Sequence, residues 1–329
     1  MEQSELDYLL SHGIEVIKMI GVGLTSTIYY VYSSNYKSYF ALKRIPSKFY
    51  SEKEYKIINL VDPHYRIQIV DSLNNQNIYY FLLEYCPIDI SRVTSHQQRL
   101  PNEKLMLYIR NLVMTIKACH DRNICNGNIK PNNFLVDEYG NVKICDFALS
   151  HFADDSSEVS ENKSSLYFMA PEVIRNRSYN PFAADIWSLG VTLYYLITRK
   201  YPFVGENNIA LQYSIVHGIY NQKLIHDILL RDVINKCLDV NPQRRGTIND
   251  ILVMPYFNQK IFQATNSKLD RRDLMFDLSL IEPYDKPHRL SLTTSIFSVQ
   301  ASFHKQSLLN TNLIRYLSES NSTEELSSI

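Results

Sequence analysis

Residues 124–148, ICNGNIKPNNFLVDEYGNVKICDFA, constrain the fold more than any other stretch of the chain. Two short apolar segments, 134–136 and 142–145, flank a turn at Tyr139 and Gly140. Apolar runs on both sides of a glycine-containing turn predict a β-hairpin. The polar residues before the first strand and after the second would then meet at one edge of the fold, where chemistry is usually placed.

Those polar residues carry a recognisable pattern. The stretch resembles the catalytic loop and metal-binding turn of eukaryotic protein kinases, H-R-D-x-K-P-x-N followed by D-F-G. The matching residues are Lys130, Asn133, Asp146 and Phe147. The H-R-D triplet is replaced by Asn126, Gly127 and Asn128, and Ala148 stands for the glycine of D-F-G.

Composition sets broad limits on this chain. It has 329 residues and is 45% hydrophobic, which suits one large or two modest domains. The formal net charge is zero, so nothing global indicates binding to nucleic acid or to an anionic membrane. The five cysteines are odd in number and lack C-x-x-C spacing, so we expect free buried thiols, with neither zinc nor a disulfide framework.

The sequence also suggests a location. The N-terminus, MEQSELDYLL, is acidic and does not resemble a signal peptide. The longest nearly apolar run, residues 186–197, is too short to span a bilayer. We therefore expect a soluble protein of the cytoplasm or nucleus.

A helical lead-in over residues 1–13 precedes a strand, a glycine turn and a second strand. A lone G-x-G, here Gly21 and Gly23, is a weak signal, and a strand after it does not suit a dinucleotide-binding fold. It does resemble the glycine-rich loop that kinases place over ATP phosphates. Ser26 stands for the third glycine and Ile28 for the valine that follows it.

The segment Phe40-Ala41-Leu42-Lys43 resembles the kinase V-A-I-K strand. The resemblance implies that Lys43 holds the α- and β-phosphates of ATP. Its implied helical partner is Glu54, with Glu52 as the alternative. The apolar residues that follow share one helical face: Ile57, Ile58, Leu60 and Val61.

The apolar strand 78–83 ends at Glu84-Tyr85-Cys86-Pro87, which resembles the hinge between kinase lobes. Leu83 would be the gatekeeper, and the backbone from Glu84 to Cys86 would contact the adenine edge. A plain strand end followed by a proline stop is the alternative. Ile28, Ala41 and Leu135 complete the implied nucleotide-binding residues.

Further motifs follow in the order that kinases have them. Residues 103–120 have the apolar spacing of an amphipathic helix. The serine-rich acidic run that follows Asp146 resembles an activation segment closed by A-P-E at Glu172. A plain surface loop would have the same composition. Asp185, in D-x-W-S-x-G, would start a buried helix and accept hydrogen bonds from the catalytic-loop backbone. Arg245 would pair with Glu172.

Together these motifs imply an α+β fold of the bilobal protein-kinase type. The predicted domain is 14–257, with a small β-rich N-lobe containing one helix (14–85) and a larger, mainly helical C-lobe (86–257). Residues 258–329 are rich in Ser, Thr and Asn, and we expect them to be largely disordered. Lys130 indicates the Ser/Thr type, and the segment beginning at Pro171 resembles the calcium/calmodulin-dependent branch.

The chain retains the residues with which kinases bind nucleotide, but it lacks the aspartate that they use in phosphate transfer. Asn133 and Asp146 supply the hard oxygen ligands that Mg²⁺ prefers, so ATP and Mg²⁺ are the implied cofactors. Asn128 has nearly the shape of the catalytic aspartate but no charge, and its amide oxygen is a far poorer base.

Three functions fit this pattern. The first is a pseudokinase that binds ATP and signals by contacts with a protein partner. The second is a slow Ser/Thr protein kinase, in which Asn128 only orients the substrate hydroxyl. The third is a scaffold that binds no nucleotide. The sequence identifies neither the substrate nor the partner.

Overall fold

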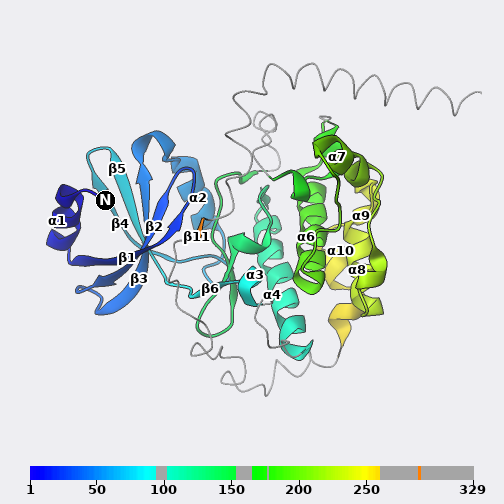
Figure 1. The fold of residues 1–329 in the computed structure, drawn as a ribbon. Coiled ribbons are helices and arrows are strands. Elements are labelled where there is room, and N and C mark those ends of the chain that lie inside the picture. The colour runs from blue at the N-terminus through cyan, green and yellow to red at the C-terminus, as the bar shows by residue number, and fades with distance from the viewer. Residues whose placement is uncertain (94–101, 153–164, 176–177, 260–287, 290–329) are drawn as a thin grey trace, which may run out of the picture.

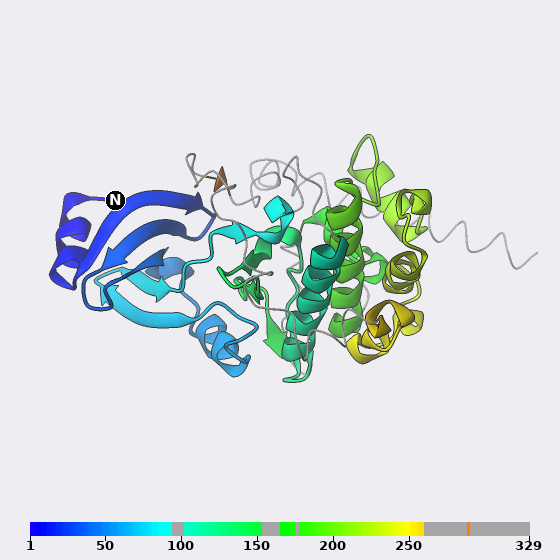
Figure 2. The same cartoon turned by 90° about the horizontal axis from the view of Figure 1, so that it is seen from below.

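The computed structural model divides the chain into a β-rich lobe and a mainly helical lobe (Figures 1 and 2). It describes residues 1–93, 102–152, 165–175, 178–259 and 288–289. The predicted bilobal α+β fold is confirmed. Residues 153–164, which hold most of the serine-rich segment, and nearly all of the predicted disordered tail lie outside the described residues.

The N-lobe contains a largely antiparallel sheet in which two of the strand pairs have register shifts. The strand order is β11-β1-β2-β3-β5-β4, and β11 alone pairs in parallel, at Gly21 and Val22 of β1. Aromatic and β-branched residues, common in β2 and β5, favour strands. The strand bounds are β1 (Ile14–Val22), β2 (Thr27–Ser33), β3 (Ser38–Pro46), β4 (Ile69–Asn75), β5 (Ile78–Leu83) and β11 (His288–Arg289).

Helix α1 (Gln3–Ser11) confirms the helical lead-in and belongs to the N-lobe. Its Leu9 is fully buried against a small core made by the sheet. Glu5, also on α1, accepts hydrogen bonds from Arg44 of β3 at 2.8 and 2.6 Å. The helix ends at Ser11, and the turn after it contains Gly13, whose φ of +75° suits glycine. The small core consists of Leu9, Ile14, Val31, Leu42, Tyr80 and Leu82.

Helix α2 (Glu52–Leu60) joins the N-lobe to the large core of the C-lobe. Ser51 caps it, with its hydroxyl accepting from the Glu54 N–H at 3.2 Å. Ile57, Ile58 and Val61 are buried as predicted. The prediction for Leu60 is wrong: it is 44% exposed, because the helix ends there and no further turn covers it.

The C-lobe is built around two long helices, α4 (Asn102–His120) and α6 (Pro181–Thr198), which lie side by side in both views (Figures 1 and 2). α6 begins four residues before Asp185, earlier than predicted. Asn180 caps it by accepting from Phe182 N at 2.9 Å, and Pro181 fits the first turn. The remaining helices are α3 (Ile90–Val93), α5 (Pro171–Ile174), α7 (Asn208–Val216), α8 (Ile228–Cys237), α9 (Pro242–Arg245) and α10 (Ile248–Leu252).

Two small sheets position the polar loop at the lobe junction. β8 (Phe134–Val136) and β9 (Val142–Ile144) form the predicted antiparallel hairpin, which ends one residue before Cys145. Its turn is closed by Asp137, which accepts from Asn141 N at 2.8 Å. β6 (Ile88–Asp89) pairs with β8, and β7 (Ile124–Cys125) with β10 (His151–Phe152).

Two further observations concern location and cysteine chemistry. Among the described residues, none of the helices combines the length and hydrophobicity that crossing a membrane requires. The five cysteines are free thiols, and all are buried except Cys145, which is partly exposed.

Candidate functional site

Lys43 and Glu54 connect the sheet to α2. The Lys43 ammonium lies 3.1 Å from a Glu54 carboxylate oxygen, and both side chains are 21% exposed. The alternative partner, Glu52, pairs instead with Lys56 one helical turn later, in an exposed surface contact. The structure therefore brings Lys43 together with Glu54 rather than with Glu52.

The charge on Lys43 is held in place by its surroundings. Burial by itself would lower the pKa of this ammonium, but the carboxylates of Glu54 and Asp146 outweigh burial and raise the pKa overall. Lys43 is consequently a fixed cation that faces the turn containing Asp146. Such a group is suited to bind phosphate oxygens.

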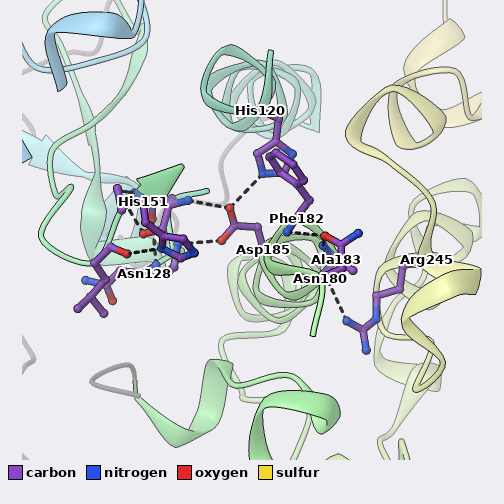
Figure 3. A network of polar contacts seen from close by, with 12 residues as sticks. His120, Asn128, His151, Asn180, Phe182, Ala183, Asp185 and Arg245 are labelled. Carbon is purple, nitrogen blue, oxygen red and sulfur yellow. Dashed lines mark hydrogen bonds and ion pairs between the residues drawn. The ribbon is translucent and has the colours of Figure 1, made fainter. Parts of the chain in front are cut away.

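The polar loop at residues 126–133 is held by Asp185 of α6 (Figure 3). The Asp185 carboxylate accepts from Asn126 N at 2.8 Å and from Gly127 N at 2.9 Å. His120 Nε2 lies 3.0 Å from the same carboxylate. Asp185 is only 2% exposed, so these bonds fix the loop in a site that excludes water.

Asn126 and Gly127, which replace the first two residues of the H-R-D triplet, stabilise the loop in different ways. The Asn126 amide donates to the Asp146 carbonyl at 2.9 Å and to Ser150 Oγ at 3.2 Å, so it ties the loop to the segment after Asp146. Gly127 has a φ of +71°, and a Cβ there would lie 3.0 Å from the Leu149 carbonyl. Gly127 therefore relieves backbone strain, and the arginine of the family pattern is absent.

Asn128, Asn133 and Asp146 form one cluster of polar contacts. The Asn128 amide donates to Asp146 Oδ2 at 2.7 Å. Asn133 Nδ2 donates to the Asn128 carbonyl at 2.8 Å and lies 3.4 Å from the same Asp146 oxygen. The residue that stands where the resemblance places the catalytic base is thus an amide that donates to the Asp146 carboxylate.

Asn133 and Asp146 carry side-chain oxygens of the kind that Mg²⁺ prefers. Because Asn133 uses its Nδ2 in hydrogen bonds, its side-chain oxygen is left to act as an acceptor beside Asp146. Within the described parts of the chain, no group of three or more His, Cys, Asp or Glu residues could hold a metal. A Mg²⁺ ion at Asn133 and Asp146 would therefore take its other ligands from phosphate oxygens and water, as this ion commonly does.

Lys130 lies in the same loop, directly before the short helix η2 (Pro131–Asn133), and is 6% exposed. Burial lowers the pKa of its ammonium, and the negative charge of Asp146 partly opposes that effect. Lys130 is therefore a second cation whose charge interacts with Asp146.

The glycine turn and several expected adenine-binding residues belong to neighbouring strands of the N-lobe sheet. Gly23 N donates to the Ser26 carbonyl at 2.8 Å, which closes the turn between β1 and β2. Gly21 pairs with Ile28 across these strands, and Ala41 pairs with Leu83 across β3 and β5.

On the C-lobe side, Leu135 lies on β8 opposite Asp89 of β6. The expected nucleotide-binding residues therefore come from both lobes.

The hinge contains an ion pair that sequence reasoning missed. Lys143 of β9 donates to both oxygens of Glu84 at 2.7 and 2.6 Å, and Glu84 Oε1 also accepts from Gln68 N at 2.6 Å. Cys86 is buried beside this pair, and burial raises the pKa of its thiol well above the ordinary value. A lysine in the short apolar strand 142–145 was the available signal, since a buried lysine requires a partner.

A second buried ion pair stabilises the C-lobe away from the loop. Arg245 donates to both oxygens of Glu172 at 2.6 and 2.7 Å. It also donates to the Ala183 carbonyl at 2.8 Å (Figure 3). Arg245 is fully buried, and its guanidinium lies 4.9 Å from the ring centroid of Trp187. This pair links the end of the A-P-E segment to α6 and α9.

The fold and this site define a two-lobed protein in which a lysine–glutamate pair and a polar loop face each other across the lobe junction. Comparison with known families places the chain more narrowly. The family model described as "Protein kinase domain" matches residues 14–257, and the chain belongs to this family.

Its similar relatives are Ser/Thr-type kinases at low identity. The carbon catabolite-derepressing protein kinase of Saccharomyces cerevisiae is 26% identical over 251 residues, 74% of this chain and 40% of that protein. The protein of the same description from Secale cereale is 30% identical over 216 residues, 64% and 43% respectively. CBL-interacting serine/threonine-protein kinase 18 of Arabidopsis thaliana is 28% identical over 229 residues, 68% and 44%. Each match spans less than half of the relative's length.

Proposed function

We propose that this chain is a catalytically impaired protein kinase that binds ATP with Mg²⁺ and signals by contacts with a protein partner. The observation that carries this proposal is the 2.7 Å hydrogen bond from the Asn128 amide to Asp146 Oδ2. It places a hydrogen-bond donor where a kinase uses a carboxylate to accept the proton of the substrate hydroxyl.

Nucleotide binding is supported by the residues that survive. Lys43 is held by Glu54 and is suited to the α- and β-phosphates, and Gly21 and Gly23 form the turn that would cover them. Asn133 and Asp146 would hold Mg²⁺, which neutralises charge on the phosphates when bound.

The transfer step lacks its base. A positioned general base contributes roughly 10² to 10⁴ in rate. At about 1.4 kcal/mol per factor of ten, the loss corresponds to about 3 to 5 kcal/mol of barrier. Gly127 also removes the arginine that would receive a phosphate on the activation segment, so phosphorylation there is not expected to switch this protein in the usual way.

A slow Ser/Thr kinase is the second candidate, because side-chain hydrogen bonds hold the backbone of the catalytic loop. Asp185 holds its backbone, Lys130 is retained, and the relatives described above are all named as kinases. In this case Asn128 orients the hydroxyl, and another carboxylate or solvent takes the proton. The sequence of the segment beginning at Pro171 further supports a place in the calcium/calmodulin-dependent branch. We propose the cytoplasm or nucleus as the location of this chain.

Two measurements on the purified chain test these functions. Thermal unfolding is first followed with and without ATP and Mg²⁺. A rise in the melting temperature supports nucleotide binding, and no rise would leave the nucleotide-free scaffold. Transfer of radiolabelled γ-phosphate to a peptide library is then measured, with Asp146→Ala as the inactive control. Rapid labelling by the wild type, absent from the control, would refute catalytic impairment.

A further inference from the structure

Both oxygens of the Asp146 carboxylate already accept hydrogen bonds from this protein. Oδ1 accepts from Ala148 N at 3.0 Å, and Oδ2 accepts from the Asn128 amide at 2.7 Å, with Asn133 Nδ2 3.4 Å away. A carboxylate facing a second carboxylate depends on a cation, whereas one facing an amide donor does not. We infer that the Asn128 amide partly replaces the divalent cation at Asp146, so that ATP binds with little dependence on Mg²⁺; this inference rests on the proposed nucleotide-binding function.

The orientation of Asn128 follows from chemistry. An ionised carboxylate only accepts hydrogen bonds, so the group that Asn128 presents to Asp146 must be its NH₂. Asn128 cannot easily turn away, because it is 5% exposed and held by its backbone. Its N–H donates to Asn126 Oδ1 at 3.1 Å, and its carbonyl accepts from Asn133 at 2.8 Å. The amide is therefore a fixed donor.

Fixed positive charges on the protein compensate for a missing cation. Lys43 and Lys130 both interact electrostatically with Asp146, and both come from the elements expected to surround the phosphates. A triphosphate approaching this site would meet the two ammonium groups, of which Lys43 is paired with Glu54, and the Asp146 carboxylate, whose oxygens already accept from amide groups. In a chain with aspartate at position 128, the same triphosphate would meet two carboxylates, and Mg²⁺ would be needed to offset them.

The test is the affinity for ATP, measured by titration calorimetry in Mg²⁺ and again in EDTA. For the wild type we expect the two affinities to agree within about threefold, below the range of roughly 5- to 150-fold that typical coupling between two ligands produces. For Asn128→Asp we expect Mg²⁺ to raise the affinity by about tenfold or more, within that range. Asn128→Ala, which removes the donor without adding charge, should be intermediate.

Asn132→Asp is the matched control. It adds the same negative charge to the same loop, at a partly exposed position next to Asn133, and should retain the wild-type ratio. A wild-type ratio of about tenfold or more, equal to that of Asn128→Asp, would overturn the inference and leave the proposed function standing. Absence of ATP binding in both buffers would instead overturn the proposed function, and the inference with it.

Discussion

The substitution Asp185→Asn tests how strongly Asp185 stabilises the loop at residues 126–133, because it replaces one of the two carboxylate oxygens. In Asp185→Asn one side-chain oxygen remains and can still accept a hydrogen bond. The other oxygen becomes an NH₂ group, which faces a backbone N–H that then has no acceptor. Two backbone donors, Asn126 N and Gly127 N, depend on this side chain at 2.8 and 2.9 Å. A hydrogen bond to a charged group contributes about 1.5–3 kcal/mol, and one of the two backbone donors loses its acceptor, so the free energy of unfolding should fall by about 1.5–3 kcal/mol. For a domain of this size that lowers the melting temperature by about 3–12 °C.

Asp121→Asn is the control for this prediction. Asp121 also makes short contacts, at 2.6 and 2.7 Å from Lys117, but its side chain is 49% exposed. Exposed ion pairs of this kind contribute about 0.2–1 kcal/mol, so the control should melt within a few degrees of the wild type. Differential scanning calorimetry measures both variants. Equal, small shifts for the two would refute the argument that burial makes the Asp185 contacts strong.

Two further predictions concern other charged groups. Lys43→Met removes a charge-assisted hydrogen bond worth about 1.5–3 kcal/mol, so the affinity for ATP measured by calorimetry should fall about 10- to 100-fold. The control, Lys56→Met, changes an exposed lysine and should bind ATP as the wild type does. Equal affinities for the two variants would contradict the role of Lys43. The Arg44 guanidinium lowers the pKa of Glu5 below its usual 4.5, and burial partly opposes this effect. Ionised Glu5 therefore stabilises the folded state above pH 4.5. This stabilisation is lost as the pH falls through the lowered pKa that Glu5 has in the folded state. Urea unfolding on either side of pH 4.5 should show that Glu5→Gln loses less stability on acidification than the wild type, and an identical loss would contradict the assignment.

The parts of this fold that sequence predicts well are those whose residues act locally. The hairpin at 134–144 follows from alternating apolar residues around a turn, and it is present with nearly the predicted bounds. Helix α2 likewise begins after its serine cap. In both cases the determining contacts lie within a few residues of one another.

The undecided or missed features depend on contacts between distant segments. Glu52 and Glu54 lie in the same first turn of α2, and only the position of the helix against β3 decides which meets Lys43. The Glu84–Lys143 pair joins residues 59 positions apart.

The same limit applies to Asn128. Its sequence identity indicates the loss of a base, whereas its donation to Asp146 required the three-dimensional arrangement of the loop.

The central claim is that this site retains its groups for binding a triphosphate and lacks the one that accepts a proton. Its most direct test is single-turnover phosphoryl transfer to a peptide, with wild type and Asn128→Asp both saturated with ATP and Mg²⁺. We predict that the variant transfers faster by about 10²- to 10⁴-fold, the usual contribution of a general base. Equal rates for the two proteins would contradict the claim.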